Sequence, residues 1–198
     1  TKNDKYPSVL MVYDANGKNI FNYRSVSRII DITFNSDNSG CYITTIGVSG
    51  GFMVSKMLYY RFDHIDYDEQ GNPYPVWETD NLETLALSVR LWGDDSIIVF
   101  GDTMCAYYDT SGNFISSYEY ERSLVDYSSN GKIAAMIFSN DERRSSELVT
   151  INCETGETVE KSLDYEVLNL QVSGDTVYMQ TRSGIESCTY LGDSISSV

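Results

Sequence analysis

A recurring turn motif constrains the fold of this chain more than any other feature of its sequence. The motif begins with aspartate or asparagine and reaches a glycine three or four residues later, with a short apolar run on either side. The first side chain accepts a backbone hydrogen bond, and the glycine supplies the positive φ of a tight turn. Each copy therefore predicts a hairpin between two antiparallel strands. The copies are Tyr13–Lys18, Tyr67–Asn72, Tyr108–Asn113 and Asn152–Glu157.

A second pattern lies between these turns: two apolar residues, one short polar residue, and then an apolar or aromatic residue. Each copy leads to a turn glycine and then to a run of residues with strong β propensity. The two patterns together predict repeats of four short strands over about 40 to 45 residues, which is the period of a propeller blade. The copies are Ile29–Ile32, Ala86–Val89, Leu124–Tyr127 and Val167–Leu170.

We therefore predict an all-β fold of β-propeller blades, each with four antiparallel strands, and about four repeats in one domain over residues 1–198. Complete repeats are expected at 27–80, 84–121 and 123–165, and partial repeats at 8–24 and 167–191. The partial repeats either pair to close a four-bladed ring or belong to a larger ring. The start within a repeat favours the larger ring, and the polar first residues without a methionine indicate a piece of a longer protein.

The Tyr-Asp-x-x-Gly turns and the segment Leu124–Lys132 resemble repeats of the WD40-like and quinoprotein-like β-propeller families, with tyrosine in place of the tryptophan of the Trp-Asp pair. The resemblance covers nearly the whole chain. The Gly-His pair typical of WD repeats is absent, since the single histidine, His64, falls in a predicted third strand. The resemblance implies a diverged bacterial propeller of unassigned function, some relatives being anchored outside the membrane. It implies no particular activity, because propellers host many unrelated functions.

Because the formal net charge is −15, two classes of partner are not expected. Nucleic acids and anionic membranes are polyanionic and would be repelled by this surface. No apolar run is long enough to span a bilayer, so no direct membrane insertion is expected in this segment. The four cysteines fit no zinc motif and are expected to be free thiols. No cofactor and no metal are expected, because no phosphate-binding loop and no metal-spaced cluster is present.

Four short polar residues occupy the same position of the second pattern and form the first candidate binding set. In a propeller the first strand of each blade faces the central channel, so these side chains would ring its mouth and bind a cation or a polar ligand. The alternative is that each one hydrogen-bonds the backbone of its own blade or of the next. The set is Asp31, Ser88, Asp126 and Asn169.

A second candidate lies in an insertion at residues 70–80, which is rich in proline and aromatic residues. Loops beside a regular scaffold often carry binding sites, so Tyr74 and Trp77 would form a contact patch. The alternative is that Trp77 begins the outer strand and packs between blades. The segment Asp66–Gly71 resembles the start of a calcium loop, but Trp77 stands where a bidentate glutamate is needed. A hairpin turn is the better interpretation of that segment.

No catalytic motif is recognisable, so no catalytic residue is assigned and an enzyme is not favoured. We expect a non-catalytic binding scaffold that presents propeller loops to a protein or glycan partner. The alternative is a glycan-active hydrolase or lyase with Asp31 and Asp126 as acid and base. The expected location is extracellular or at a bacterial cell surface, through an anchor outside this sequence, and a cytoplasmic location is the alternative.

Overall fold

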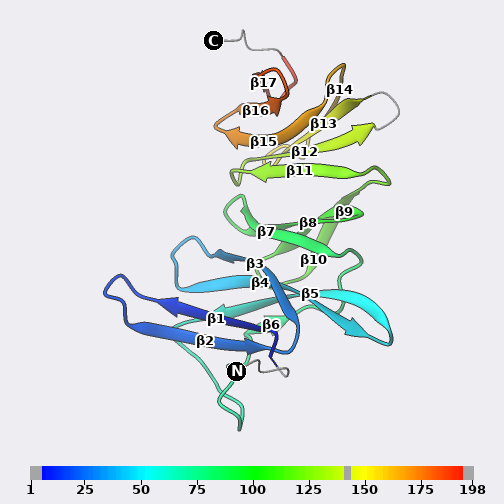
Figure 1. The fold of residues 1–198 in the computed structure, drawn as a ribbon. Coiled ribbons are helices and arrows are strands. Elements are labelled where there is room, and N and C mark those ends of the chain that lie inside the picture. The colour runs from blue at the N-terminus through cyan, green and yellow to red at the C-terminus, as the bar shows by residue number, and fades with distance from the viewer. Residues whose placement is uncertain (1–5, 141–143, 194–198) are drawn as a thin grey trace. The chain divides into compact units, whose positions relative to one another are not determined.

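The computed structural model describes residues 6–140 and 144–193, and these residues form β-strands joined by turns and loops (Figure 1). Within these ranges, five antiparallel sheets follow one another along the chain, and the strands of each sheet are neighbours in sequence order. The first sheet has two strands, the next three have four each, and the last has three. The chain divides into two compact units, Thr1–Leu91 with Ser96–Tyr118, and Trp92–Asp95 with Glu119–Val198.

The first unit contains the first three sheets, except for the end residues Trp92 and Glu119 of the third. The first sheet consists of β1 (Ser8–Tyr13) and β2 (Asn19–Ser25). The second sheet consists of β3 (Arg28–Phe34), β4 (Gly40–Ser49), β5 (Phe52–Arg61) and β6 (Trp77–Glu78). The third sheet consists of β7 (Ala86–Trp92), β8 (Ser96–Gly101), β9 (Met104–Asp109) and β10 (Phe114–Glu119).

The second unit contains the last two sheets. The fourth sheet consists of β11 (Leu124–Ser129), β12 (Ile133–Asn140), β13 (Ser145–Asn152) and β14 (Thr158–Leu163). The fifth sheet consists of β15 (Val167–Ser173), β16 (Thr176–Thr181) and β17 (Ile185–Thr189).

The predicted fold class is confirmed, since the described residues form antiparallel sheets, three of them four-stranded like propeller blades, and none of the described residues is helical. That residues 1–198 form one domain stays a prediction. The placement of His64 in a third strand was wrong. Strand β5 ends at Arg61, whose guanidinium binds the Asp63 carboxylate, and the Phe62 N–H donates to Ser39. Residues 62–64 then form a bend, which leaves His64 exposed outside the strand.

Alternation along β4 explains how neighbouring sheets of the first unit pack. Successive side chains of a strand point to opposite faces of its sheet. Ile43 packs with Val12 and Phe21 of the first sheet, whereas Tyr42 packs with Val99 of the third sheet. The second sheet is therefore covered on both faces. In the second unit, β12, β13 and the fifth sheet share an apolar cluster in the same way.

The four predicted turns form, and in each one the glycine N–H donates to the carbonyl of the residue that starts the turn. A fifth copy at 189–192 has the same hydrogen bond, from Gly192 to Thr189. The sequence pattern missed this copy because it required aspartate or asparagine at the start. Here the Thr189 hydroxyl replaces the carboxylate and accepts the N–H of Asp193 at 3.2 Å.

The turn aspartates make stability depend on pH. Hydrogen bonds from the Asn113 side chain and backbone lower the pKa of Asp109 below 3.8, and the Asn72 backbone N–H lowers that of Asp68. A lowered pKa in the folded state stabilises the fold above the unfolded pKa, and this stabilisation is lost as pH falls through the folded pKa. We expect the urea midpoint to drop between about pH 5 and pH 3. Asp109→Asn, which accepts hydrogen bonds but does not titrate, should flatten that drop; an identical pH profile would contradict the assignment.

Serine hydroxyls join consecutive sheets at equivalent points, which the sequence did not reveal. In each case a serine Oγ accepts a backbone N–H from the next sheet. The donor is the first apolar residue of that sheet's copy of the second sequence pattern. The serine satisfies a backbone donor at the start of the next sheet, where an unpaired N–H would be costly. The pairs are Ser8 with Ile29 at 3.1 Å, Ser55 with Ala86 at 2.9 Å, and Ser146 with Val167 at 2.9 Å.

Candidate functional site

The first strand of three sheets has a β-bulge directly before its predicted polar residue. The pairing register shifts between Ile29 and Asp31, between Leu124 and Asp126, and between Val167 and Asn169. A bulge adds one unpaired residue and redirects the side chain that follows it. The recurrent polar residue of the second sequence pattern is therefore tied to a recurrent distortion of the strand.

Asp31 binds the first strand of the next sheet. Its Oδ2 accepts the N–H of Val89 at 3.1 Å and forms an ion pair with the guanidinium of Arg90. Arg90 also donates to the carbonyl of Val89 at 2.6 Å. The side chain of Asp31 is 23% exposed, so this carboxylate is held between two strands of the first unit.

Asp126 makes the equivalent contact within the second unit. Its Oδ2 accepts the N–H of Leu170 at 2.7 Å, and its Oδ1 accepts the N–H of Tyr127 at 2.9 Å. Leu170 follows Asn169 in the pattern, just as Val89 follows Ser88. Both aspartates thus bind the backbone of the next sheet. This arrangement corresponds to the alternative given above for the four polar residues, in which they hydrogen-bond backbone groups and no ligand.

The other two members of the polar set differ from the aspartates. Ser88 is 1% exposed, and its Oγ has no hydrogen-bond partner among residues 6–140 and 144–193. Asn169 is exposed and donates to the side chain of Gln180 at 3.0 Å. Asp31 and Ser88 belong to one unit, and Asp126 and Asn169 to the other. Their role as one ligand-binding ring stays a prediction.

Trp77 anchors the end of the inserted loop to the third sheet. It begins β6, and its indole Nε1 donates to the carbonyl of Thr110 at 3.0 Å. Its ring lies 5.8 Å from that of Tyr59, and a Cβ placed on Gly112 would lie 2.7 Å from the indole. Tyr74, in contrast, is 59% exposed. Of the two predicted loop residues, Tyr74 is the one that offers its ring to solvent.

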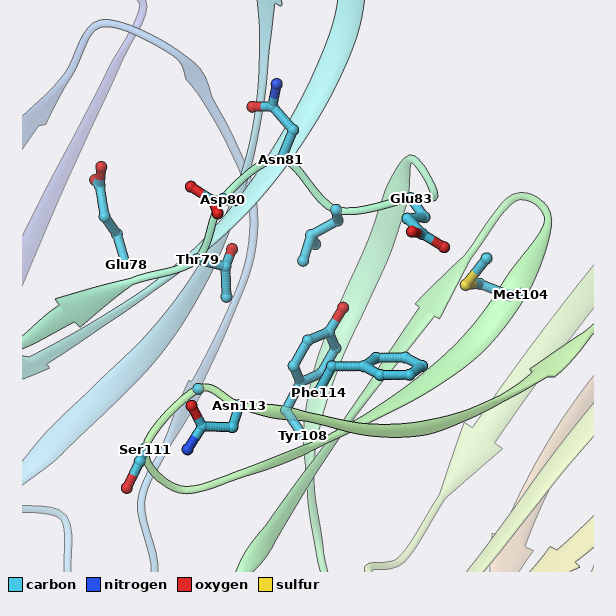
Figure 2. Close-up of a pocket in the computed structure, with 12 residues that line it drawn as sticks. Glu78, Thr79, Asp80, Asn81, Glu83, Met104, Tyr108, Ser111, Asn113 and Phe114 are labelled. Atoms are coloured by element: carbon cyan, nitrogen blue, oxygen red, sulfur yellow. The ribbon is translucent and has the colours of Figure 1, made fainter.

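A hollow of about 430 Å³ lies beside this anchor, between the segment that follows Trp77 and the β9–β10 hairpin. Figure 2 shows the rings of Tyr108 and Phe114 on one side of the hollow, with the Tyr108 hydroxyl pointing toward the segment that carries Asp80 and Glu83. We call this hollow the acid-aromatic groove. The residues that define it are Asp80, Asn81, Glu83, Met104, Tyr108 and Phe114.

The groove combines aromatic rings with exposed carboxylates. Phe114 is 56% exposed and meets the 6% exposed Tyr108 edge-on, with ring centroids 5.8 Å apart. Burial, and then the negative charge of Glu83, raise the pKa of Tyr108 above its ordinary value. No ion pair involves Asp80 or Glu83 within the described part of the chain. Such a surface suits a cationic group, which gains both ionic and cation–π attraction.

The sequence offered only a partial signal for this groove. Phe114 directly follows the third turn motif, and the acidic residues stand at the end of the insertion and just beyond it. Their meeting depends on how the second sheet packs on the third, which no local pattern encodes. In the described residues, no three His, Cys, Asp or Glu side chains gather as they would around a metal ion. No described helix is long and apolar enough to cross a membrane.

Comparison with known proteins gives a family and a fold. Residues 1–195 match a family described as "Family of unknown function (DUF5711)". No curated protein matches the chain. The solved WD40 domain of Neurospora crassa Pan2 is similar, with a TM-score of 0.63 and 10% identity over 93% of this chain and 57% of that one.

Two bacterial structures are similar as well. BamB from Moraxella catarrhalis has a TM-score of 0.64 and 13% identity, over 97% of this chain and 59% of that one. PorZ from Porphyromonas gingivalis has a TM-score of 0.57 and 13% identity, over 96% of this chain and 24% of that one. The chain thus spans between a quarter and three fifths of these three solved chains. At such identities the likeness shows the fold alone, and it confirms the predicted resemblance to WD40-like propellers.

Proposed function

Because this chain belongs to DUF5711, a family of unknown function, we propose its function from its own surface: a non-catalytic scaffold that binds a protein partner. The binding site is the acid-aromatic groove, and the partner contributes a segment that carries lysine or arginine beside an apolar side chain. The observation behind this proposal is the combination of an exposed aromatic ring, Phe114, with two carboxylates that lack an ion pair among the described residues.

Charge supports a basic partner. Glu78, at the border of the groove, already pairs with Lys56 at 3.1 Å, whereas Asp80 and Glu83 are exposed. An ammonium or guanidinium group above Phe114 would lie near those carboxylates. The net charge of −15 would also speed the approach of a basic segment at low ionic strength.

Asp31 and Asp126, which would be the acid and base of a glycan-active enzyme, already contact other groups of the protein. Asp31 binds a backbone N–H and Arg90, and both oxygens of Asp126 accept backbone N–H groups. A general acid or base needs an oxygen that can reach substrate and exchange a proton. The observed contacts therefore support a scaffold rather than a hydrolase.

The proposed location is the bacterial cell surface. Supporting it is the similarity to PorZ, whose structure is described as that of an essential bacterial surface component. Free cysteines are compatible with this location because three of the four are buried. Burial raises the pKa of Cys41 and Cys105 to about 12, so these thiols stay protonated and unreactive. Recovery of the protein only from the cytosol after cell fractionation would contradict this part of the proposal.

Calorimetric titration with a basic pentapeptide, Lys-Phe-Lys-Phe-Lys, tests the groove. We expect binding that weakens with salt, and no binding of Glu-Phe-Glu-Phe-Glu. The double variant Asp80→Asn/Glu83→Gln should lose about fivefold to tenfold in affinity, which is the effect of two exposed charge contacts. Phe114→Ser should weaken binding at all salt concentrations.

The control keeps the change in net charge the same. Glu154→Gln/Glu157→Gln removes two exposed carboxylates from the turn after β13, in the other unit. It should bind the basic pentapeptide like the unmodified chain. An equal loss in both double variants would show attraction to net charge only, and binding of the acidic pentapeptide would contradict the groove.

A further inference from the structure

The tip of the β4–β5 hairpin extends beyond its sheet. Strand β3 pairs with β4 only as far as Ile46, which lies opposite Arg28. On the other side, the last backbone bond to β5 from the segment after β6 runs from Leu82 to Ser55. Residues 47–54 therefore form a two-stranded projection with no strand beside either edge among the described residues. We call residues 47–54 the apolar finger.

The finger exposes large apolar side chains on both of its strands. Val48 and Phe52 are each 76% exposed, and Met53 is 61% exposed. Gly50 and Gly51, with φ of 59° and 87°, form the two-residue turn that holds the strands in register. No residue of the finger is charged. In soluble proteins, adjacent exposed apolar side chains of this kind mark interaction sites.

The finger makes this hairpin longer than its counterpart in the third sheet. In the third sheet, β8 and β9 have six residues each, against ten each in β4 and β5, so their hairpin is shorter. A longer hairpin costs backbone entropy, and this one exposes apolar surface as well. Such an extension is stabilising only if something covers it.

The finger and the acid-aromatic groove share a border. A hollow of about 640 Å³ lies against the finger and is lined by Gly47, Val48, Val54, Lys56, Asp80 and Asn81. Asp80 and Asn81 also line the groove. The segment that carries these two residues therefore separates two adjoining hollows of the first unit.

We propose that the finger is the second contact of the basic partner segment, an inference that rests on the proposed function of the groove. The segment occupies the groove with a cationic side chain, passes Asp80, and adds as a β-strand along a free edge of the finger. Its apolar side chains pack on Val48 and Met53, which lie opposite each other across the hairpin. Unpaired strand edges bind extended peptides through backbone hydrogen bonds, with side-chain contacts adding specificity.

Charge argues for a protein strand as the occupant. The finger itself is neutral, but Asp80 lies beside it and the chain carries a net charge of −15. A segment that alternates basic and β-branched residues matches both features. A membrane surface is the other class of occupant for exposed apolar side chains, and it is an outcome of the test.

The test compares two peptides on the full chain. The short probe is Lys-Phe-Lys-Phe-Lys, and the long probe adds the eight residues Gly-Thr-Val-Lys-Val-Thr-Val-Lys. We expect the long probe to bind about tenfold tighter. Val48→Ser/Phe52→Ser/Met53→Ser should abolish that gain and leave the affinity for the short probe unchanged, which also shows that the variant is folded. The control Ile185→Ser/Leu191→Ser, which changes exposed apolar residues of the second unit, should keep the gain.

The outcomes separate the two proposals. Binding of the short probe without any gain for the long one, or a gain that survives the triple variant, would refute the finger and leave the groove intact. Failure of both probes would refute the proposed function, and the finger inference with it. Binding to phosphatidylcholine vesicles that the triple variant loses, without a gain for the long probe, would assign the finger to a membrane.

Discussion

Replacing Gly40 with alanine should destabilise the chain by about 3 kcal/mol or more, as expected for overpacking that a backbone must absorb. The new Cβ would lie 2.4 Å from the carbonyl oxygen of Tyr60 and 2.9 Å from the Tyr59 hydroxyl. The Tyr60 carbonyl belongs to β5, where Tyr60 lies opposite Cys41 of β4 and directly follows Leu58 and Tyr59, which also pair with β6. Relief of the clash therefore has to move paired backbone.

Gly47→Ala is the matched control for Gly40→Ala, because both glycines lie in β4. At Gly47 the new Cβ would meet the hydroxyl oxygen of Ser27 at 2.6 Å, which is the end of a side chain that can rotate. We expect a loss below about 1 kcal/mol, as is typical of a tolerated surface change. Urea denaturation followed by circular dichroism measures both variants. Similar midpoints for the two variants would contradict this account of Gly40.

Asp126→Ala should cost about 2 to 4 kcal/mol, because it removes the carboxylate that accepts two backbone N–H groups. The N–H of Leu170 and the N–H of Tyr127 both donate to this carboxylate, and Leu170 is only 7% exposed. Asp126→Asn keeps an oxygen acceptor and should lose less. Asn169→Ala, at the equivalent position of the fifth sheet, should change stability by less than about 0.5 kcal/mol, since Asn169 is an exposed surface residue.

Hydrogen exchange locates the effect of Asp126→Ala. Urea midpoints give the loss of stability, and the exchange rates of the Leu170 and Tyr127 amides should rise in the alanine variant. An alanine variant with unchanged midpoint and unchanged exchange would show that the carboxylate is not structural. If such a variant also lost activity on a glycan, the hydrolase alternative would replace the scaffold.

The contacts of Asp31 and Asp126 give the polar position of the repeat a physical meaning. In both cases a bulge precedes the aspartate, and its carboxylate accepts the N–H of the residue after the equivalent position in the next sheet. A repeat protein whose units stack only on their neighbours needs such inter-repeat bonds. The sequence pattern singles out this position but leaves open whether a ligand or a backbone group is its partner.

Trp77 illustrates how tertiary contacts select among interpretations. An aromatic residue in a proline-rich insertion fits a binding loop as well as a core position. The structure places the indole against Gly112 and the carbonyl of Thr110, which follow β9. The residues around Trp77 do not distinguish a binding loop from a core position, because the contact that decides between them joins segments that are far apart along the chain.

The sequence by itself determined the strands, the hairpin turns and the class of fold. Those features depend on a few neighbouring residues: a glycine that adopts positive φ, an oxygen that accepts a nearby N–H, and apolar residues alternating along a strand. The tertiary structure alone decided that Asp80, Glu83 and Phe114 form one groove, and that Val48, Phe52 and Met53 stay exposed. Exposure depends on which sheet covers which face, and the same alternating run of residues is compatible with a covered strand or a projecting one.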